Sequence, residues 1–183
     1  YENLQKLILN NVEEINEYII QNLSYTQSDL EKASHHLFEA GGKRIRPFLL
    51  RTTYEIFEKN YLPILPLAAA VEILHTFTLI HDDIMDQDDL RRGKPTVHTK
   101  FGIPMAILAG DILNVKVYSI IGNLNVDPNL KLRLFQETSH TLTKLCEGQA
   151  YDISFESQEK VTIEEYLSMI ERKTAELFSF CTR

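Results

Sequence analysis

The sequence has 183 residues, of which 44% are apolar and 25% are charged, a composition typical of one globular domain with a substantial core. Its net charge of −7 argues against general binding to nucleic acid or to anionic membrane surfaces. The two cysteines, Cys146 and Cys181, lack metal-ligand spacing and are too few for a disulfide framework. A reducing, cytoplasmic location is therefore expected.

Apolar residues recur at helical spacing along nearly the whole chain, which predicts an all-α fold. An amphipathic helix is expected over residues 4–20. Ser28 followed by Glu31 predicts a capping box at the start of a second helix, which should end at the glycine pair 41–42. A third helix is expected after Pro47, because proline suits a first helical turn.

Pro63 and Pro66 are expected to open a long apolar helix that ends among residues 82–90. Its most apolar stretch, residues 62–80, is interrupted by prolines and polar side chains. We therefore expect a buried helix there and no transmembrane segment. A polar turn over residues 91–95 should end this part of the fold.

The second half of the sequence also predicts helices. One is expected over residues 104–122, a turn over 125–128, and another helix over 130–146. Thr162, with Glu165 three residues later, should cap a final helix. No run of alternating strands and no internal repeat is found in the sequence.

Both ends of the sequence fall inside helical patterns. The chain begins with Tyr1, and its last residues, 178–183, contain no Gly or Pro that would stop a helix. We therefore expect residues 1–183 to form a single helical domain that is incomplete at its C-terminus.

Five aspartates crowd residues 82–89, at the C-terminal end of the long apolar helix. Asp82 and Asp86 are four residues apart, so they stack on one helix face and repel each other. The helix dipole opposes acidic groups at this end as well. Such a cluster suits Mg²⁺, which also takes phosphate oxygens and water as ligands. A solvated acidic helix end is the alternative, and the metal site is favoured over it.

Two turns rich in basic residues lie on either side of this helix in the sequence. In residues 41–47, Lys43 and Arg46 follow a flexible glycine pair, and residues 91–95 form the second turn. Backbone amides and cations of this kind can bind a diphosphate. The alternatives are a helix C-cap with basic residues that complement the dipole, and a second turn that only neutralises the acids.

His75 lies seven residues before Asp82, two turns along the same helix face. A single histidine on an apolar helix is usually a core residue with one hydrogen bond. Its alignment with the acids favours a position facing the same site, and spacing alone leaves the two interpretations open.

As a set, these motifs resemble the trans-isoprenyl (polyprenyl) diphosphate synthase family, and in particular the archaeal short-chain geranylgeranyl and farnesyl diphosphate synthases. The matching segments, in the family's order, are GGKRIRP at 41–47, EILHTFTLIHDDIMD at 72–86, RRGKPTVH at 91–98, GD at 110–111, EGQAYD at 147–152 and RKT at 172–174. The resemblance implies an isoprenoid-synthase-type helical bundle around a central cavity.

The resemblance also implies a role for individual residues, among which Asp82, Asp83, Asp86 and Lys173 would be catalytic. The implied contacts are Asp82 and Asp86 with Mg²⁺, Asp83 in support; Arg91, Lys173 and Thr174 with the allylic diphosphate; Lys43, Arg46, His75 and Arg92 with isopentenyl diphosphate; and Gln149 and Asp152 as groups that support the metal side.

The activity implied is condensation of isopentenyl diphosphate with an allylic diphosphate (dimethylallyl, geranyl or farnesyl) by a Mg²⁺-dependent prenyltransferase. The product would be a short all-trans prenyl diphosphate, with geranylgeranyl favoured over farnesyl diphosphate. Residues just before the acidic motif set chain length in the family, here Phe77 and Thr78. Helical spacing places Thr78 on the face of Asp82, so a role for Phe77 follows from the resemblance alone. Homodimerisation is implied as well.

The sequence departs from the family pattern in one respect: a second aspartate-rich motif is not found, and Asp88-Asp89 lacks its spacing. We therefore expect these 183 residues alone to be inactive. Two further interpretations stay open, a non-catalytic subunit of a heteromeric prenyl synthase and a related helical terpene cyclase. The intact acidic and basic motifs argue against the first, and the paired basic turns argue against the second.

Overall fold

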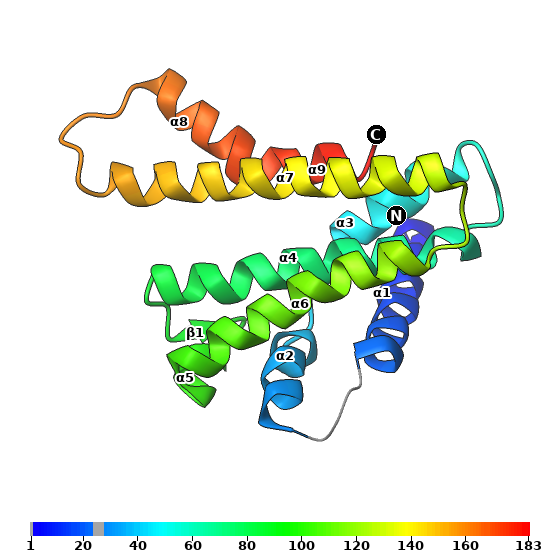
Figure 1. Cartoon of the computed structure of the whole chain (residues 1–183), viewed down its shortest axis with the longest axis horizontal. Coiled ribbons are helices and arrows are strands. Elements are labelled where there is room, and N and C mark those ends of the chain that lie inside the picture. Colours follow the sequence, from blue (N-terminus) through cyan, green and yellow to red (C-terminus); the bar gives the residue numbers. More distant parts are fainter. Residues whose placement is uncertain (1, 24–27) are drawn as a thin grey trace. The chain divides into compact units, whose positions relative to one another are not determined.

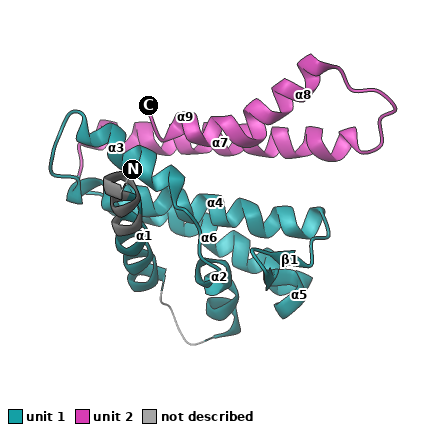
Figure 2. Cartoon of the chain, turned by 180° about the vertical axis from the view of Figure 1, so that it is seen from behind, with its two compact units in different colours: residues 1–125 teal, residues 126–183 magenta. Residues whose placement is uncertain are grey.

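The computed structural model describes the backbone of residues 2–23 and 28–183, and the side chains of residues 8, 11–23 and 28–183. The chain divides into two compact units, residues 1–125 and residues 126–183 (Figure 2). Each unit is described by itself below, and the expectation of one domain over the whole chain stays a prediction.

The first unit is built from six α-helices and a minimal hairpin in its described residues (Figure 1). In chain order these are α1 (Glu2–Leu23), α2 (Asp29–Glu39), α3 (Ile45–Glu55), a 3₁₀ turn (Leu62–Ile64), α4 (Leu65–Met85), β1 (Leu90–Arg91), β2 (Lys94–Pro95), α5 (Val97–Phe101) and α6 (Ile103–Asn123).

The second unit is wholly helical in its regular elements. These are α7 (Pro128–Phe155), α8 (Ile163–Ile170), a single π-helical turn (Glu171–Ala175) and α9 (Glu176–Phe180). The all-α prediction is therefore confirmed, with the four residues of β1 and β2 as its only strand among the described residues.

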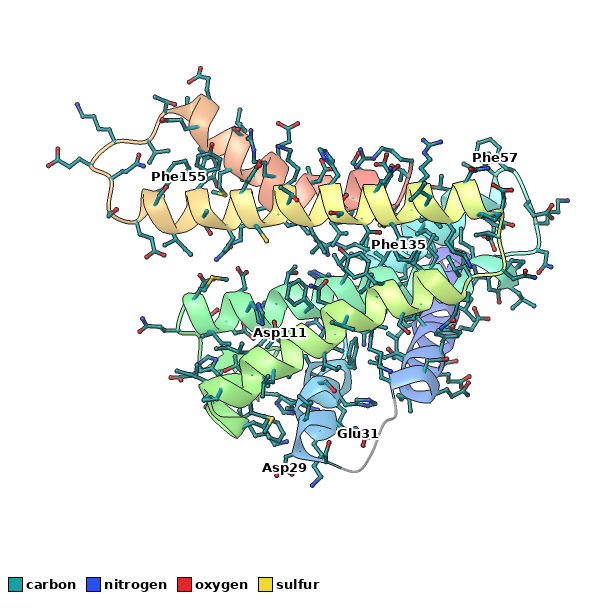
Figure 3. The ribbon with its side chains drawn as sticks, in the orientation of Figure 1. Asp29, Glu31, Phe57, Asp111, Phe135 and Phe155 are labelled. Atoms are coloured by element: carbon teal, nitrogen blue, oxygen red, sulfur yellow. The ribbon has the colours of Figure 1, made fainter. Side chains whose placement is uncertain are left out.

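Local sequence signals account for most helix ends. The Ser28 hydroxyl accepts a hydrogen bond from the Glu31 N–H, and both Asp29 and Glu31 lie in the first turn of α2 (Figure 3). Thr162 and Glu165 form the predicted capping box of α8. At the end of α2, Ala40 is the C-cap and Gly41 follows with φ of 77°, a left-handed conformation that favours glycine.

Two expectations about the elements are corrected, and one short helix is added to those expected. The polar turn at residues 91–95 is part of a hairpin in which Leu90 pairs with Pro95. A short helix, α5, follows it. The helix expected over 130–146 continues to Phe155, because Gly148 lies in helical conformation inside it and does not end it.

Helices α4 and α6 form the core of the first unit and lie side by side (Figure 1). Alanines on both helices, including Ala69 on α4 and Ala106 on α6, are fully buried, and small side chains favour close helix packing. By length and composition the segments Leu62–Met85 and Ile103–Asn123 could each cross a membrane, a property that they share with core helices of water-soluble proteins. More than half of the most apolar window of α4 is buried within the structure.

A buried ion pair joins three helices of the first unit at the basic turn. The Arg44 guanidinium donates to the Glu72 carboxylate of α4 at 2.8 Å, to Asn16 Oδ1 of α1 at 2.9 Å and to the Phe38 carbonyl of α2 at 3.3 Å. The side chains of Arg44 and Glu72 are only 1% and 4% exposed. Arg44 itself has φ of 47°, so these contacts hold a left-handed residue in place.

Removing the arginine from this pair should strongly destabilise the fold. We expect Arg44→Met to lower the free energy of unfolding by about 3–5 kcal/mol, because Glu72 would stay buried without its partner. Urea unfolding followed by circular dichroism measures the loss. The double variant Arg44→Met/Glu72→Leu should recover part of it, since both charges are then absent.

The matched control is Lys32→Met. Lys32 pairs with Asp29 at 3.1 Å, but the two side chains are 61% and 74% exposed, so we expect a change of at most about 0.5 kcal/mol. Equal effects of Arg44→Met and Lys32→Met would show that the buried pair does not hold the fold together.

Candidate functional site

The acidic end of α4 is open where the helix stops. Asp82 is half-buried and Asp86, the C-cap residue, is exposed. The Asp86 N–H donates to the Asp82 carbonyl at 2.8 Å, and the Asp88 N–H donates to the Asp83 carbonyl at 3.0 Å. Gln87 lies between them with φ of 57°, in the left-handed conformation that ends helices. The local sequence therefore stops the helix just after it has placed two carboxylates one turn apart.

Asp83 has a different environment from Asp82 and Asp86. Its side chain is 1% exposed, and its Oδ1 accepts a hydrogen bond from Arg91 Nε at 2.5 Å. Burial raises the pKa of the Asp83 carboxyl, and the Arg91 guanidinium opposes that rise. The structure thus places Asp83 as the anchor of Arg91, and its predicted role in support of a metal ion stays a prediction.

The carboxylates at this helix end fit a Mg²⁺ ion whose other ligands are phosphate oxygens and water. Among the described residues, no group of three or more His, Cys, Asp or Glu side chains could hold a metal ion. Asp82 and Asp86 supply oxygen ligands from two carboxylates, as Mg²⁺ uses when substrate phosphates and water complete its octahedron. The residues therefore fit a metal ion that binds together with a phosphate-bearing ligand.

A cleft of about 470 Å³ lies beside the basic turn at residues 41–47. Most of the residues around it are cationic or polar. They are Gly42, Lys43, Arg44, Ile45, Arg46, Glu72, His75 and Arg92. Four residues predicted to bind one diphosphate, Lys43, Arg46, His75 and Arg92, are therefore brought together in this cleft.

His75 supports an arginine in this cleft. Its Nε2 lies 3.1 Å from Arg46 Nη1. Because a guanidinium can only donate, Nε2 is the acceptor and the proton of the neutral ring is on Nδ1. Burial, and then the charges of Arg46 and Arg92, lower the pKa of His75 to about 3. The imidazole is therefore neutral near pH 7 and orients Arg46.

Gly42 allows two guanidinium groups to approach each other. A Cβ at this position would lie 2.6 Å from Arg92 Nη1 and 2.7 Å from Arg44 Nη1. Burial and the nearby Arg44 lower the pKa of Arg92, whose Nη1 also donates to the Gly41 carbonyl. Cations held this close to one another favour binding of an anion between or beside them.

The two residues predicted to control chain length lie on different sides of α4. The Thr78 hydroxyl donates to the His75 carbonyl at 2.8 Å within the helix. The Phe77 ring meets the His81 ring edge-on, with centroids 4.9 Å apart. His81 Nε2 lies 3.2 Å from the Ile107 carbonyl and 3.8 Å from Asp111, both on α6 (Figure 3). Phe77 thus belongs to the α4–α6 side of the helix, and its role in chain length stays a prediction.

The remaining predicted site residues belong to the second unit. Lys173 Nζ lies 2.5 Å from Asp152 Oδ2, so these two residues form an ion pair between the π-helical turn and α7. Thr174, in the same turn, is exposed, and Gln149 is half-buried on α7. Their predicted roles toward an allylic diphosphate and a metal stay predictions.

Gly148 sets the distance between α7 and the π-helical turn. A Cβ at Gly148 would lie 2.4 Å from the Lys173 backbone nitrogen and 2.8 Å from its Cα. Only a glycine allows the two backbones to come this close. Gly148 and the π-helical turn therefore fix the position of Lys173 relative to Asp152.

Sequence analysis missed two residues that shape the site. Arg44 lies in the basic segment 41–47, where the sequence assigns no separate role to it, whereas in the structure it is buried and paired with Glu72. Its partner, Glu72, gave the available signal, since a carboxylate inside an apolar helix requires a buried cation. Gly148 lay inside a matched motif without a role, and a glycine in the middle of a long helix is itself a sign of close packing.

Taken together, the fold and the site define an all-α protein with an acidic helix end and a cationic cleft on the same unit. The sequence profile of the polyprenyl synthetase family matches residues 27–183. The chain belongs to the polyprenyl synthetase family.

Individual relatives agree with this assignment. The chain is 49% identical over 151 residues to geranylgeranyl diphosphate synthase of Methanosarcina mazei, covering 82% of this chain and 47% of that protein. It is 51% identical over 152 residues to geranylgeranyl diphosphate synthase of Saccharolobus solfataricus, covering 82% and 46%. The solved structure of geranylgeranyl pyrophosphate synthetase from Geoglobus acetivorans is 38% identical, with a TM-score of 0.93 over 96% of this chain and 58% of that one. The chain spans about half the length of the curated relatives it matches.

The depressed pKa of His75 predicts a dependence of stability on pH. The unfolded chain binds a proton at His75 below about pH 6.5, whereas the folded chain does so only near pH 3. The folded state should therefore lose stability as the pH falls through this window, and His75→Gln should remove that part of the loss. Urea unfolding at several pH values measures it, with His140→Gln, at an exposed histidine, as the control.

A direct titration gives a second readout of the same group. Nuclear magnetic resonance should find the His75 ring neutral at pH 5, and added pyrophosphate should raise its pKa by neutralising the nearby guanidinium charges. A His75 pKa near 6.5 that does not change when pyrophosphate is added would contradict the burial of His75 beside Arg46 and Arg92.

Gly148→Ala should destabilise the second unit. The added methyl group meets backbone atoms that cannot rotate away, so we expect a loss of about 1–3 kcal/mol in the free energy of unfolding. Cys146→Ala, at an exposed position of the same helix, is the control and should be nearly neutral. Similar stabilities of the two variants would show that α7 and the π-helical turn have room to separate.

Proposed function

We propose that the protein is a Mg²⁺-dependent prenyltransferase that condenses isopentenyl diphosphate with an allylic diphosphate. One observation carries the proposal: α4 holds His75 in the cationic cleft and Asp82 seven residues later at its acidic end. Seven residues of helix span about 10 Å and return to within about 20° of the same face. Two anion sites of different chemistry are thus built on one rigid element.

In this proposal the cationic cleft binds isopentenyl diphosphate. Arg46, oriented by the neutral His75, and Arg92, next to Gly42, supply planar donors to phosphate oxygens. Lys43 is exposed beside them and adds a compact positive charge. Glu72 is the one carboxylate among the described residues that line this cleft, and it is paired with Arg44. These residues therefore offer cations for a diphosphate and no unpaired carboxylate for a metal ion.

The acidic end of α4 binds the allylic diphosphate. Asp82 and Asp86 would hold Mg²⁺, which when bound stabilises the negative charge of the departing pyrophosphate. Arg91, held by the buried Asp83, would bind the same diphosphate directly. Lys173 and Thr174 are proposed to contact the allylic substrate, and Gln149 and Asp152 to support the metal side.

The reaction follows from this placement of charges. The allylic carbon–oxygen bond breaks, pyrophosphate leaves against the cations of the site, and an allylic carbocation forms. The double bond of isopentenyl diphosphate attacks that cation, and loss of one proton, for which the departing pyrophosphate is the proposed base, restores a double bond. The residues of this chain bind and orient both diphosphates.

Three further properties belong to the proposal. Geranylgeranyl diphosphate is favoured as product over farnesyl diphosphate, supported by the relatives above and by the aromatic Phe77 before the acidic motif. A homodimer is supported by large exposed apolar side chains on α6, at Ile103, Leu108 and Val115. A cytoplasmic location is supported by the composition and by the two free cysteines.

Binding experiments on the two anion sites test the proposal. Asp82→Asn/Asp86→Asn should abolish the Mg²⁺-dependent part of geranyl diphosphate binding, because the two carboxylates are the proposed ligands, and should leave isopentenyl diphosphate binding within about twofold. Arg92→Met should weaken isopentenyl diphosphate binding and leave the Mg²⁺-dependent part of geranyl diphosphate binding nearly unchanged. Calorimetry with and without Mg²⁺ measures both, and Asp29→Asn, at an exposed helix start, is the control.

Product analysis by mass then tests the expectation that these 183 residues alone are inactive, and it separates the possible activities where a product forms. A linear C20 diphosphate supports the proposed product, a C15 diphosphate supports the farnesyl alternative, and a cyclised hydrocarbon would identify a terpene cyclase. Wild-type protein that binds neither diphosphate would contradict the proposal altogether.

A further inference from the structure

The hairpin that carries Arg91 and Arg92 is tied to the end of α2. Lys94 Nζ donates to the Glu39 carbonyl at 2.8 Å, and Arg92 Nη1 donates to the Gly41 carbonyl. His36 Nε2 lies 2.7 Å from the carbonyl of Pro95. Three polar contacts thus join residues 92, 94 and 95 of the hairpin to the last turns of α2 and to the glycine that follows its C-cap.

The chemistry of a helix end explains two of these contacts. The last carbonyls of a helix have no partner within the helix, and the dipole makes this end negative. Glu39 is the last residue of α2, and Gly41 follows its C-cap. Lys94 and Arg92 therefore bind the C-terminal end of α2 as cations that satisfy exposed carbonyl oxygens.

His36 supplies a contact of a different kind, because it is buried. The residue is 4% exposed, and its ring meets the Phe101 ring edge-on, with centroids 5.6 Å apart. The Pro95 carbonyl can only accept, so Nε2 carries the proton. Lys100 Nζ, 3.3 Å from Nδ1, can only donate, so Nδ1 accepts. Both ring nitrogens are therefore used, in one tautomer, to link α2 with β2 and α5 (Figure 2).

The consequence reaches the diphosphate cleft. Arg92 has φ of 53°, a left-handed conformation that arginine adopts only when its surroundings hold it there. The neighbouring Gly93 also has positive φ, which glycine adopts readily in two-residue hairpin loops, so Arg92 is the residue of the tip that disfavours this geometry. Asp83 holds Arg91 on the strand before the tip, and His36 and Lys94 hold the strand after it.

We propose that His36 and Lys94 are positioning residues for substrate binding: they dock the hairpin on α2 and thereby hold the Arg92 guanidinium in the cleft. Neither residue lines the cleft itself. The role toward isopentenyl diphosphate rests on the proposed function, whereas the docking itself rests only on the contacts above.

The test compares neighbouring histidines of one helix. His36→Phe keeps the ring and its contact with Phe101 but removes both polar contacts, and Lys94→Met removes the cation. His35→Phe is the matched control, because His35 also contacts a carbonyl, that of Leu23 at 3.3 Å, and this contact does not involve the hairpin. His36→Gln is the conservative variant, since its amide can still donate to the Pro95 carbonyl.

Three measurements on the full chain are made for each variant. They are the dissociation constant of isopentenyl diphosphate by calorimetry without Mg²⁺, amide hydrogen exchange over residues 90–96, and the urea midpoint. We expect His36→Phe and Lys94→Met to weaken binding roughly tenfold and to speed exchange at residues 90–96. His36→Gln should restore most of the affinity, and His35→Phe should change neither quantity.

The outcomes separate this inference from the proposed function. Wild-type affinity and wild-type exchange in His36→Phe and Lys94→Met would overturn the inference, as would an equal loss of affinity in His35→Phe. If the wild-type chain does not bind isopentenyl diphosphate, the proposed function fails and with it the role in binding. Faster exchange at residues 90–96 in His36→Phe would in that case still support the docking.

Discussion

Glu72 lies inside the apolar helix α4, where a carboxylate without a partner would be strongly destabilising. Its partner, Arg44, comes from the basic turn between α2 and α3 and reaches α1 and α2 with its other nitrogens. A guanidinium has its donors in a fixed plane, so binding Glu72, Asn16 and the Phe38 carbonyl together restricts the position of the backbone at Arg44. The buried pair therefore determines where Lys43 and Arg46 lie. Arg44 and Glu72 are paired with each other and act on the cleft only through this positioning.

This constraint explains why the cleft can hold several cations without an anion. Arg44 is neutralised by Glu72 and Arg91 by Asp83, so neither adds an uncompensated charge to the interior. His75 stays neutral at physiological pH because burial and the surrounding arginines disfavour its protonation. The remaining positive charge belongs to Lys43, Arg46 and Arg92, of which Lys43 and Arg92 are exposed, so water or an anion can solvate it. The cleft is thus preorganised for an anion at a tolerable electrostatic cost.

Local signals predicted what depends on local interactions. Periodicity predicted the helices, Thr162 and Glu165 predicted their capping box, and the four-residue spacing of Asp82 and Asp86 predicted two carboxylates on one face. Spacing could not separate Asp83 from its neighbours, since its burial depends on Arg91, eight residues away across a hairpin. The pairing of Arg44 with Glu72 spans 28 residues and the π-helical turn depends on Gly148 of another helix, so both follow from tertiary packing. The family resemblance supplied candidate residues, but not which of them hold the structure and which remain open to a ligand.

The positions of the acids along α4 show how one helix serves both purposes. Glu72 and Asp83 are eleven residues apart, which is three turns and brings them to within about 20° of the same direction. Both are buried, and each holds an arginine from a different basic turn, Arg44 from one and Arg91 from the other. His75, Asp82 and Asp86 lie on a neighbouring direction of the same helix, and none of the three is fully buried. The buried acids of α4, Glu72 and Asp83, therefore hold the two basic turns in place. The accessible acids of the same helix, Asp82 and Asp86, lie beside these turns. Since both sets are attached to one rigid element, helix geometry sets the separation of the two proposed anion sites.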